Sequence, residues 1–148
     1  MITAIFISPE PQADQEQVGR IELVAGQGIV GDRNFGKANC PGQNLTLIES
    51  EEIENYNQTY QQNLPLAGTR RNMITRDVRL NDLVGKEFQI GEVKLKGIEL
   101  CEPCATLGGL LENEGINKTE VIKAFLGKGG LRADVLTSGC IEVGMHIG

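Results

Sequence analysis

The sequence predicts a mainly β domain (α+β in class), in which a closed or nearly closed β-barrel carries a few peripheral helices. Three observations predict it: many short stretches rich in apolar and β-branched residues, glycine-containing turns between them, and few stretches with helical periodicity. No repeat and no linker divides the 148 residues, a length that suits one domain with a sizeable core. We therefore expect a single domain over residues 1–148.

The first half of the chain is predicted to supply strands, one long loop and one helix. Strands are expected at residues 1–7, 21–24, 44–48 and 73–74. The polar stretch 8–19 contains two prolines and is predicted to be a surface loop. Residues 29–42 form a long loop of turn formers, and loops of this length are typical of functional segments. Ser50, which precedes two glutamates, is the predicted N-cap of a helix.

The second half contains a predicted hairpin followed by helices and strands. Its two arms flank Gly91-Glu92, a two-residue connection that allows a type II′ turn. The apolar alternation shifts near Gly97, which predicts a β-bulge. The elements expected here are a helical turn at 80–85, hairpin strands at 86–90 and 93–100, helices at 106–112 and 118–126, and strands at 131–136 and 140–147.

Composition and charge argue against several classes of function. The net charge is −6 and the chain has no basic stripe with interleaved aromatic residues, so we expect no nucleic acid partner. No apolar run approaches the roughly 20 residues that span a bilayer, and the first residues lack the basic region of a secretory signal. We therefore expect a cytoplasmic protein with no membrane partner, whose cysteines are thiols rather than disulfides.

A Cys-x-x-Cys pair follows the second arm of the predicted hairpin. Cys101 continues the strand pattern, whereas Cys104 follows a proline in a turn and is expected to be the more exposed thiol. Three chemistries use such a pair: a zinc site, for which Cys40 and Cys140 would complete four ligands, a dithiol redox centre, and a single reactive thiolate. Two buried cysteines that act as small apolar residues are the fourth interpretation.

Basic residues beside glycine turns form the second group of candidates. Arginine binds oxyanions through bidentate hydrogen bonds, and glycine allows backbone amides to approach an anion. In an acidic chain these residues predict a local anion site, although a solvated surface arginine has the same sequence signature. The candidates are Arg33, Arg70, Arg71, Lys128 and Arg132. The glycine-rich motifs of nucleotide-binding folds do not occur.

Several motifs, taken in order, resemble the MOSC domain, the module also found at the C-terminus of molybdenum cofactor sulfurases. The likeness extends over nearly the whole chain. Each motif is modest, but their order and spacing together are specific. The motifs are Gly31-Asp32-Arg33, Asn44 to Glu49, Arg70 to Arg76, Leu83 to Gly91, Leu100 to Cys104, Gly129 to Ala133 and Gly139 to Gly144.

This resemblance implies a β-barrel with peripheral helices and a pocket at one end. It also implies that Cys104 is the family's defining cysteine, which ligates the metal in molybdenum-dependent relatives, and that Arg33, Arg70 and Asn72 line the cofactor pocket. We therefore expect the chain to bind the molybdenum cofactor (molybdopterin) or to carry or transfer sulfur. Lys128 and Arg132 are expected to be further contacts to the anionic cofactor.

The resemblance also sets the expected activity and partners. Relatives reduce N-hydroxylated compounds with molybdenum or are proposed to transfer sulfur. Here Asn34 stands where the family often has histidine, and Met145 where it often has an acid, so binding or carrying is the expected role. The likeness includes no pyridoxal phosphate domain, so we expect no sulfur extraction from cysteine by that route. Expected partners are an anionic pterin or a sulfur donor or acceptor protein.

Overall fold

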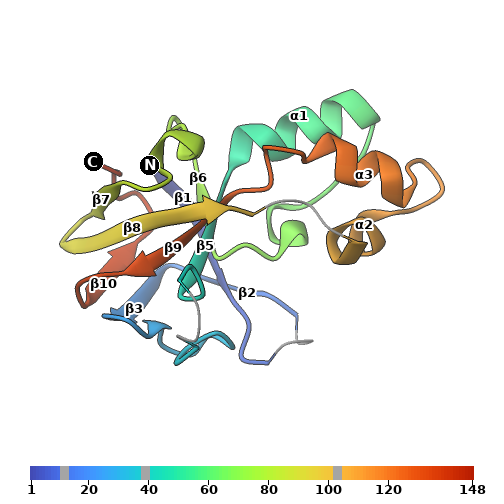
Figure 1. The fold of residues 1–148 in the computed structure, drawn as a ribbon. Helices are drawn as coiled ribbons and strands as arrows, with labels where there is room; N and C mark the ends of the chain where they lie inside the picture. Colours follow the sequence, from blue (N-terminus) through green and yellow to red (C-terminus); the bar gives the residue numbers. More distant parts are fainter. Residues whose placement is uncertain (11–13, 38–40, 102–104) are drawn as a thin grey trace.

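The computed structural model describes residues 1–10, 14–37, 41–101 and 105–148 (Figure 1). The strands are β1 (Ile2–Ile7), β2 (Glu16–Val18), β3 (Arg20–Val24), β4 (Gly28–Ile29), β5 (Leu45–Glu49), β6 (Met73–Thr75), β7 (Glu87–Ile90), β8 (Val93–Leu100), β9 (Leu131–Val135) and β10 (Gly139–Glu142). The helices are α1 (Ser50–Tyr60), α2 (Ala105–Leu111) and α3 (Lys118–Ala124), with 3-10 turns η1 (Leu66–Thr69) and η2 (Leu80–Leu83). Most of the predicted elements are confirmed.

Seven strands form one mixed sheet that curls into a half-barrel. Its order is β2-β1-β6-β5-β9-β8-β7, in which β5 and β6 run parallel. A three-stranded sheet of order β10-β3-β4 packs its apolar residues onto the same core. The fold is therefore mainly β, as predicted, with the helices gathered on one side of the large sheet (Figure 1).

The predicted closed or nearly closed barrel is only partly confirmed, because the two sheets do not join in one continuous ladder. The predicted strand 140–147 ends at Glu142, since Gly144 has a positive φ of 97° that interrupts the extended backbone. Met145 and Ile147 instead make isolated backbone contacts, the first with Ile2 of β1 and the second with β7. Single contacts of this kind do not complete a continuous strand ladder, so the barrel is not closed.

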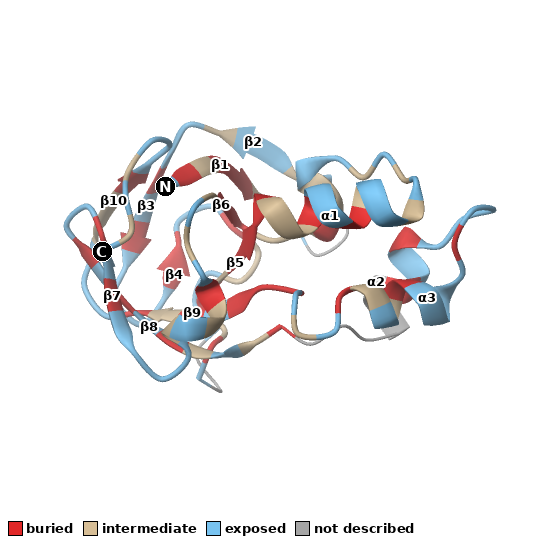
Figure 2. Ribbon diagram, turned by 90° about the horizontal axis from the view of Figure 1, so that it is seen from above, coloured by how far each residue is buried: buried red, intermediate tan, exposed pale blue. Residues whose placement is uncertain are grey.

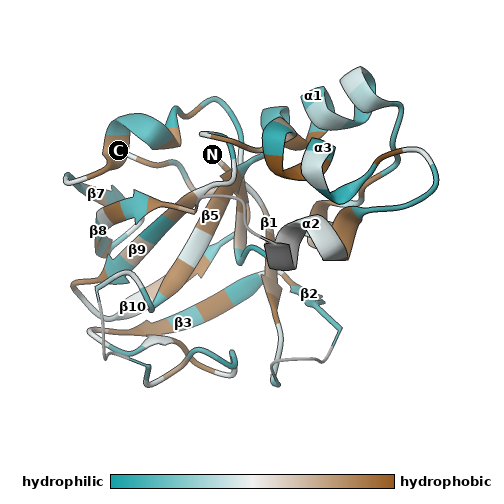
Figure 3. Cartoon of the chain, turned by 45° about the vertical axis from the view of Figure 1, so that its right-hand side comes forward, coloured by the Kyte–Doolittle hydropathy of each residue, from teal (hydrophilic) through white to brown (hydrophobic). Residues whose placement is uncertain are grey.

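Buried and hydrophobic residues colour much of the central strands (Figures 2 and 3). Their side chains alternate between the two faces of the sheet and belong to two apolar clusters. One cluster fills the inside of the half-barrel, where Leu47, Met73 and Leu131 are fully buried. The other cluster includes Ile48 and Ile74, which pack with residues of α1 and α3. Each buried side chain of this size stabilises the fold by roughly 1.5–3 kcal/mol. The sheet is thus fixed from both faces, which holds its strand ends in place.

The predicted hairpin and bulge are both confirmed. Strands β7 and β8 pair Ile90 with Val93 around Gly91, whose φ is 58°. The register of β8 against β9 shifts between Gly97 and Glu99. A Cβ at Gly97 would lie 2.1 Å from the carbonyl oxygen of Leu83 in η2, so the close approach of η2 to the bulge requires glycine.

Two local predictions are wrong. Glu49, and not Ser50, is the N-cap of α1, and the Ser50 hydroxyl bonds the Glu51 carboxylate at 3.2 Å. The predicted loop 8–19 contains β2, an edge strand whose polar residues give no apolar alternation in the sequence. Within the described ranges, no helix is both long and apolar enough to cross a bilayer.

Candidate functional site

The N-terminal end of β6 brings several of the predicted motifs together. The carbonyl of Asn72 accepts the Phe6 amide of β1 at 2.7 Å, and its side chain reaches Thr46 of β5. Thr46 in turn pairs with Arg132 of β9. Because Thr46 lies two residues before Ile48, this row of side chains is on the helix-facing side of the sheet, outside the half-barrel. The candidate site is therefore built on four neighbouring strands.

Asp32 is a buried carboxylate that braces the long loop against the end of β1. Its Oδ1 accepts the Ser8 amide at 3.0 Å and the Asn72 side-chain amide at 3.4 Å. Its Oδ2 accepts the Asn34 amide at 3.2 Å, an Asx-turn contact within its own loop. With three donors already bound, the carboxylate of Asp32 fixes the backbone of the long loop to the residue that follows β1.

Asn72 is buried, and both polar atoms of its side chain are bonded inside the protein. Its Oδ1 accepts the Thr46 amide at 3.1 Å and the Thr46 hydroxyl at 3.3 Å. Its Nδ2 donates to the Phe6 carbonyl at 3.2 Å as well as to Asp32. Asn72, predicted to line the cofactor pocket, thus connects three strands and a loop.

Three arginines surround this polar network, and we call them the arginine corner: Arg33, Arg70 and Arg71. Arg70 has a left-handed φ of 60° after η1, and its Nη2 donates to the Ser8 hydroxyl at 3.4 Å. The Arg33 amide donates to the Ser8 carbonyl at 2.7 Å, and the Arg71 Nε donates to the Gly129 carbonyl at 2.8 Å. Two loops that are distant in sequence thus place their cations at one corner.

The electrostatics of Arg33 indicate excess positive potential at this corner. Burial lowers the pKa of Arg33 below its ordinary value, and the charges of Arg70 and Arg71 lower it further, against the opposite effect of Asp32. The guanidinium remains charged at neutral pH. An oxyanion placed here would therefore meet a field that one buried carboxylate does not cancel.

Arg132 and Lys128, the other predicted anion contacts, are placed differently. Arg132 borders a hollow of about 150 Å³ beside the arginine corner, and its Nε lies 3.6 Å from a Glu99 carboxylate oxygen. We call this cavity the Lys37–Arg132 hollow. The described residues that line it are Asn34, Lys37, Gly42, Gln43, Leu45, Thr46 and Arg132. Lys128 is exposed in the turn after α3 and does not belong to that lining.

The Cys-x-x-Cys pair begins next to the arginine corner. Cys101 is buried, which agrees with its continuing the strand pattern. Gly129, whose carbonyl holds Arg71, packs against the Cys101 carbonyl so closely that a Cβ on Gly129 would lie 2.1 Å from it. Cys104 and Cys40 lie outside the described residues, so the prediction that Cys104 is the catalytic thiol and metal ligand stays a prediction.

Cys140 lies far from Cys101. It is in β10, where its sulfur is 3.1 Å from Arg20 Nη2, and its carbonyl is near Gly91, just before β8 begins. Cys101 follows the other end of that eight-residue strand, which spans about 25 Å. Zinc–sulfur bonds are about 2.3 Å, so these two thiols do not share one zinc ion. Among the described side chains, no three His, Cys, Asp or Glu residues gather as metal ligands.

Two residues of the network were not expected from the sequence. Ser8 and Thr46 are single hydroxyl residues without a spacing signature, and each becomes important only because β1, β5 and β6 are neighbours. The available signal was positional and concerned Ser8 alone, which directly follows the predicted strand 1–7, whereas Thr46 lies in the middle of the predicted strand 44–48. Strand ends are common places for functional side chains.

Comparisons with known proteins agree with this fold. A family model described as MOSC domain matches residues 32–148. The crystal structure of the YuaD protein from Bacillus subtilis superposes with a TM-score of 0.83 at 17% identity, covering 99% of this chain and 94% of that one. YiiM from Geobacillus stearothermophilus gives 0.75 at 18% identity, covering 99% and 73%. YiiM from Escherichia coli gives 0.70 at 14% identity, covering 99% and 67%. No curated protein sequence gives a match.

Proposed function

Because the chain belongs to the MOSC domain family, we propose that it binds the molybdenum cofactor, or a sulfurated precursor of it, at the arginine corner. The observation that carries this proposal is that Arg33, Arg70 and Arg71 lie around one buried polar network. When bound, the cofactor would supply two-electron redox chemistry or a sulfur-bearing metal. Sulfur transfer and reduction of N-hydroxylated compounds are the activities that the loaded protein would be tested for.

The residues present suit an anionic ligand. Guanidinium groups form paired hydrogen bonds with phosphate and other oxyanions, and burial strengthens such bonds. Asp32 already accepts three N–H donors, and its one negative charge offsets only part of the charge of the three arginines. The arginines are therefore the groups that would face the cofactor.

Cys104 is the proposed thiolate. It follows buried Cys101 by three positions, and the residue that packs on Cys101 also binds Arg71. A thiolate is a soft ligand that suits molybdenum, and it is also the group that holds a persulfide in a sulfur carrier. The burial of Cys101 supports Cys104 as the accessible member of the pair.

A loading experiment tests the proposal directly. Purified, reduced protein is incubated with isolated molybdenum cofactor and desalted, and molybdenum, pterin and zinc are measured per chain. We expect wild type to retain molybdenum and pterin, whereas Cys104→Ser and Arg70→Gln lose most of both. The matched controls are Cys140→Ser, a thiol in the other sheet, and Lys86→Gln, an exposed cation before β7.

The controls decide between this proposal and a different metal protein. Retention of molybdenum and pterin by both Cys104→Ser and Arg70→Gln would contradict the assigned site. Tightly held zinc without pterin in the wild type would contradict cofactor binding altogether. Circular dichroism of each variant checks that any loss does not come from unfolding.

A further inference from the structure

We propose that the Lys37–Arg132 hollow is a second anion subsite, distinct from the arginine corner, and that the ligand of this protein carries two anionic groups. This inference rests on the proposed function for the identity of the ligand, but the subsite itself can be tested without the cofactor. Its volume of about 150 Å³ equals about five waters at roughly 30 Å³ each, which accommodates a tetrahedral oxyanion such as a phosphate group.

The chemistry of the lining selects for an anion. Lys37 and Arg132 provide positive charge, the first from the long loop and the second from strand β9. The side-chain amides of Asn34 and Gln43 add hydrogen-bonding groups to the lining, whereas the Thr46 hydroxyl donates its proton to Asn72. A guanidinium, an ammonium and neutral donors around a small polar hollow are the groups that recognise phosphate.

Two carboxylates next to the hollow shape it without filling it. Asp134 Oδ1 accepts the Gly42 amide at 2.7 Å and so fixes the loop to β9. Glu99 lies 3.6 Å from Arg132, and the two side chains are 62% and 44% exposed. An exposed pair of this kind contributes little to stability, so an incoming anion can compete with Glu99 for Arg132.

A chain of side-chain hydrogen bonds fixes the spacing between the two subsites. Thr46 borders the hollow and bonds Asn72, Asn72 bonds Asp32, and Asp32 braces the loop that carries Arg33. The two cationic centres therefore sit on one rigid frame. A ligand with two anionic groups at the matching distance binds both at once and gains affinity through effective concentration.

The test uses inorganic phosphate as the probe and amide NMR of the full chain as the readout. Phosphate is titrated into labelled protein while the amides of Gly42 and Thr46 report on the hollow and those of Arg33 and Arg71 report on the arginine corner. We expect shifts at both sets. We expect Arg132→Gln to weaken binding at the hollow by about fivefold or more and Glu99→Gln to strengthen it by about twofold.

Three comparisons make the result decisive. Lys86→Gln removes an equal charge elsewhere and should leave the affinity of the hollow unchanged. Arg70→Gln should weaken phosphate binding at the corner only. Shifts confined to Arg33 and Arg71, or equal losses in Arg132→Gln and Lys86→Gln, would overturn the second subsite. Cofactor loading by wild type would remain intact in that case, so failure of this inference is distinguishable from failure of the proposed function.

Discussion

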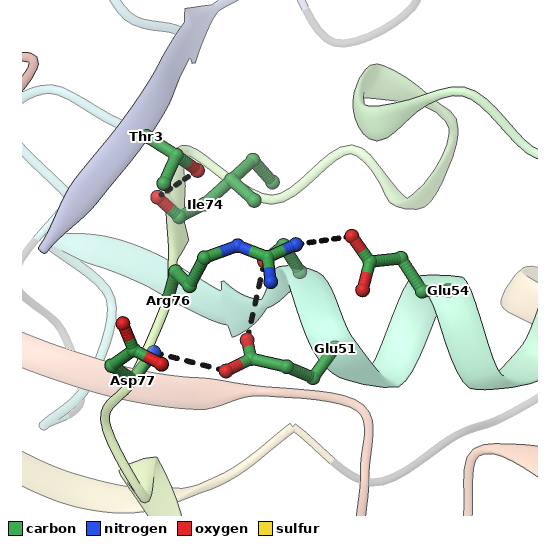
Figure 4. Close-up of polar contacts among 7 residues, drawn as sticks. Thr3, Glu51, Glu54, Ile74, Arg76 and Asp77 are labelled. Carbon is green, nitrogen blue, oxygen red and sulfur yellow. Dashed lines mark hydrogen bonds and ion pairs between the residues drawn. The ribbon is translucent and has the colours of Figure 1, made fainter.

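The two ends of strand β6 carry arginines in opposite settings. At the C-terminal end, Arg76 forms an ion pair with Glu54 on α1 (Figure 4), and both side chains are partly exposed. At the N-terminal end, Arg70 donates to a serine hydroxyl and Arg71 to a backbone carbonyl. Among the contacts of the described residues, arginine thus bonds a carboxylate at one end and a hydroxyl and a carbonyl at the other.

The difference shows how an acidic protein can keep a local positive field. At the C-terminal end, the carboxylates of α1 project toward solvent and meet the cation, so the charges offset one another. At the N-terminal end, the nearby carboxylate of Asp32 is buried and bonded to N–H donors of three residues. Its charge stabilises the backbone of the corner and offsets only part of the charge of the three arginines.

The largest expected effect is on the frame of the corner. Asn72→Ala removes a buried side chain that bonds Thr46, Phe6 and Asp32, and leaves their polar groups without that partner. We expect the free energy of unfolding to fall by about 2–4 kcal/mol in urea titrations. The matched control is Asn81→Ala, which removes one contact to a carbonyl and should cost about 1 kcal/mol. Equal losses in the two variants would contradict the network.

The next largest effect on stability is expected at Arg71, where two variants distinguish the contribution of the charge from that of the guanidinium geometry. Arg71→Gln removes the bond from Nε to Gly129 and should lower the free energy of unfolding by about 1–2 kcal/mol, with weaker phosphate binding. Arg71→Lys keeps the charge but lacks the fixed fork of the guanidinium. We expect it to recover part of the phosphate affinity and none of the stability, as measured by NMR titration and urea unfolding. Full recovery of both would show that only the charge matters.

The sequence predicted features that depend on near neighbours. The hairpin around Gly91 and the bulge at Gly97 follow from turn chemistry and alternation within a few residues. The contacts of Asn72 could not be predicted in this way, because Thr46 and Phe6 lie 26 and 66 positions away and meet it only through the strand order. The open barrel likewise depends on how the last residues pack between two strands.

The same limit applies to the candidate site. The motifs indicated the arginines of the corner, because guanidinium groups beside glycine turns have a chemical signature in the sequence. They did not separate Asn72, which connects strands, from Arg70, which carries the charge of the corner. They also grouped Lys128 with Arg132, although only Arg132 borders the hollow in the described part of the chain. The different roles of these residues depend on which strands are neighbours in the sheet and in what register they pair.

A smaller effect on the free energy of unfolding is expected from Glu49, the last residue of β5. Burial raises the pKa of Glu49 above its ordinary value of 4.5, against the opposite effect of Arg79. The folded protein therefore binds this proton more tightly than the unfolded chain, so the stability from Glu49 is full below about pH 4.5 and is lost as the pH rises through the raised pKa. Glu49→Gln resembles the protonated form.

Unfolding of Glu49→Gln at two pH values tests this sign. We expect the variant to be more stable than wild type at about pH 7 and nearly equal to it at about pH 4, with a gain smaller than the Asn72→Ala loss. Urea titrations at both pH values give the difference. A stability difference that does not change with pH would show that Glu49 does not titrate between them.

The smallest effect is expected at Arg76, and it completes the comparison of the two ends. Its side chain is 39% exposed and that of Glu54 is 58% exposed, so their ion pair should contribute about 0–1 kcal/mol. Arg76→Gln should therefore unfold close to wild type, and the remaining difference should vanish at about 1 M salt, where the screening length is about 3 Å. The Arg71→Gln loss should persist in the same salt, because a bond to a carbonyl is not a pair of opposite charges. If salt removed both losses equally, the two ends of β6 would be electrostatically alike, and the arginine corner would lose its distinction as a site for an anion.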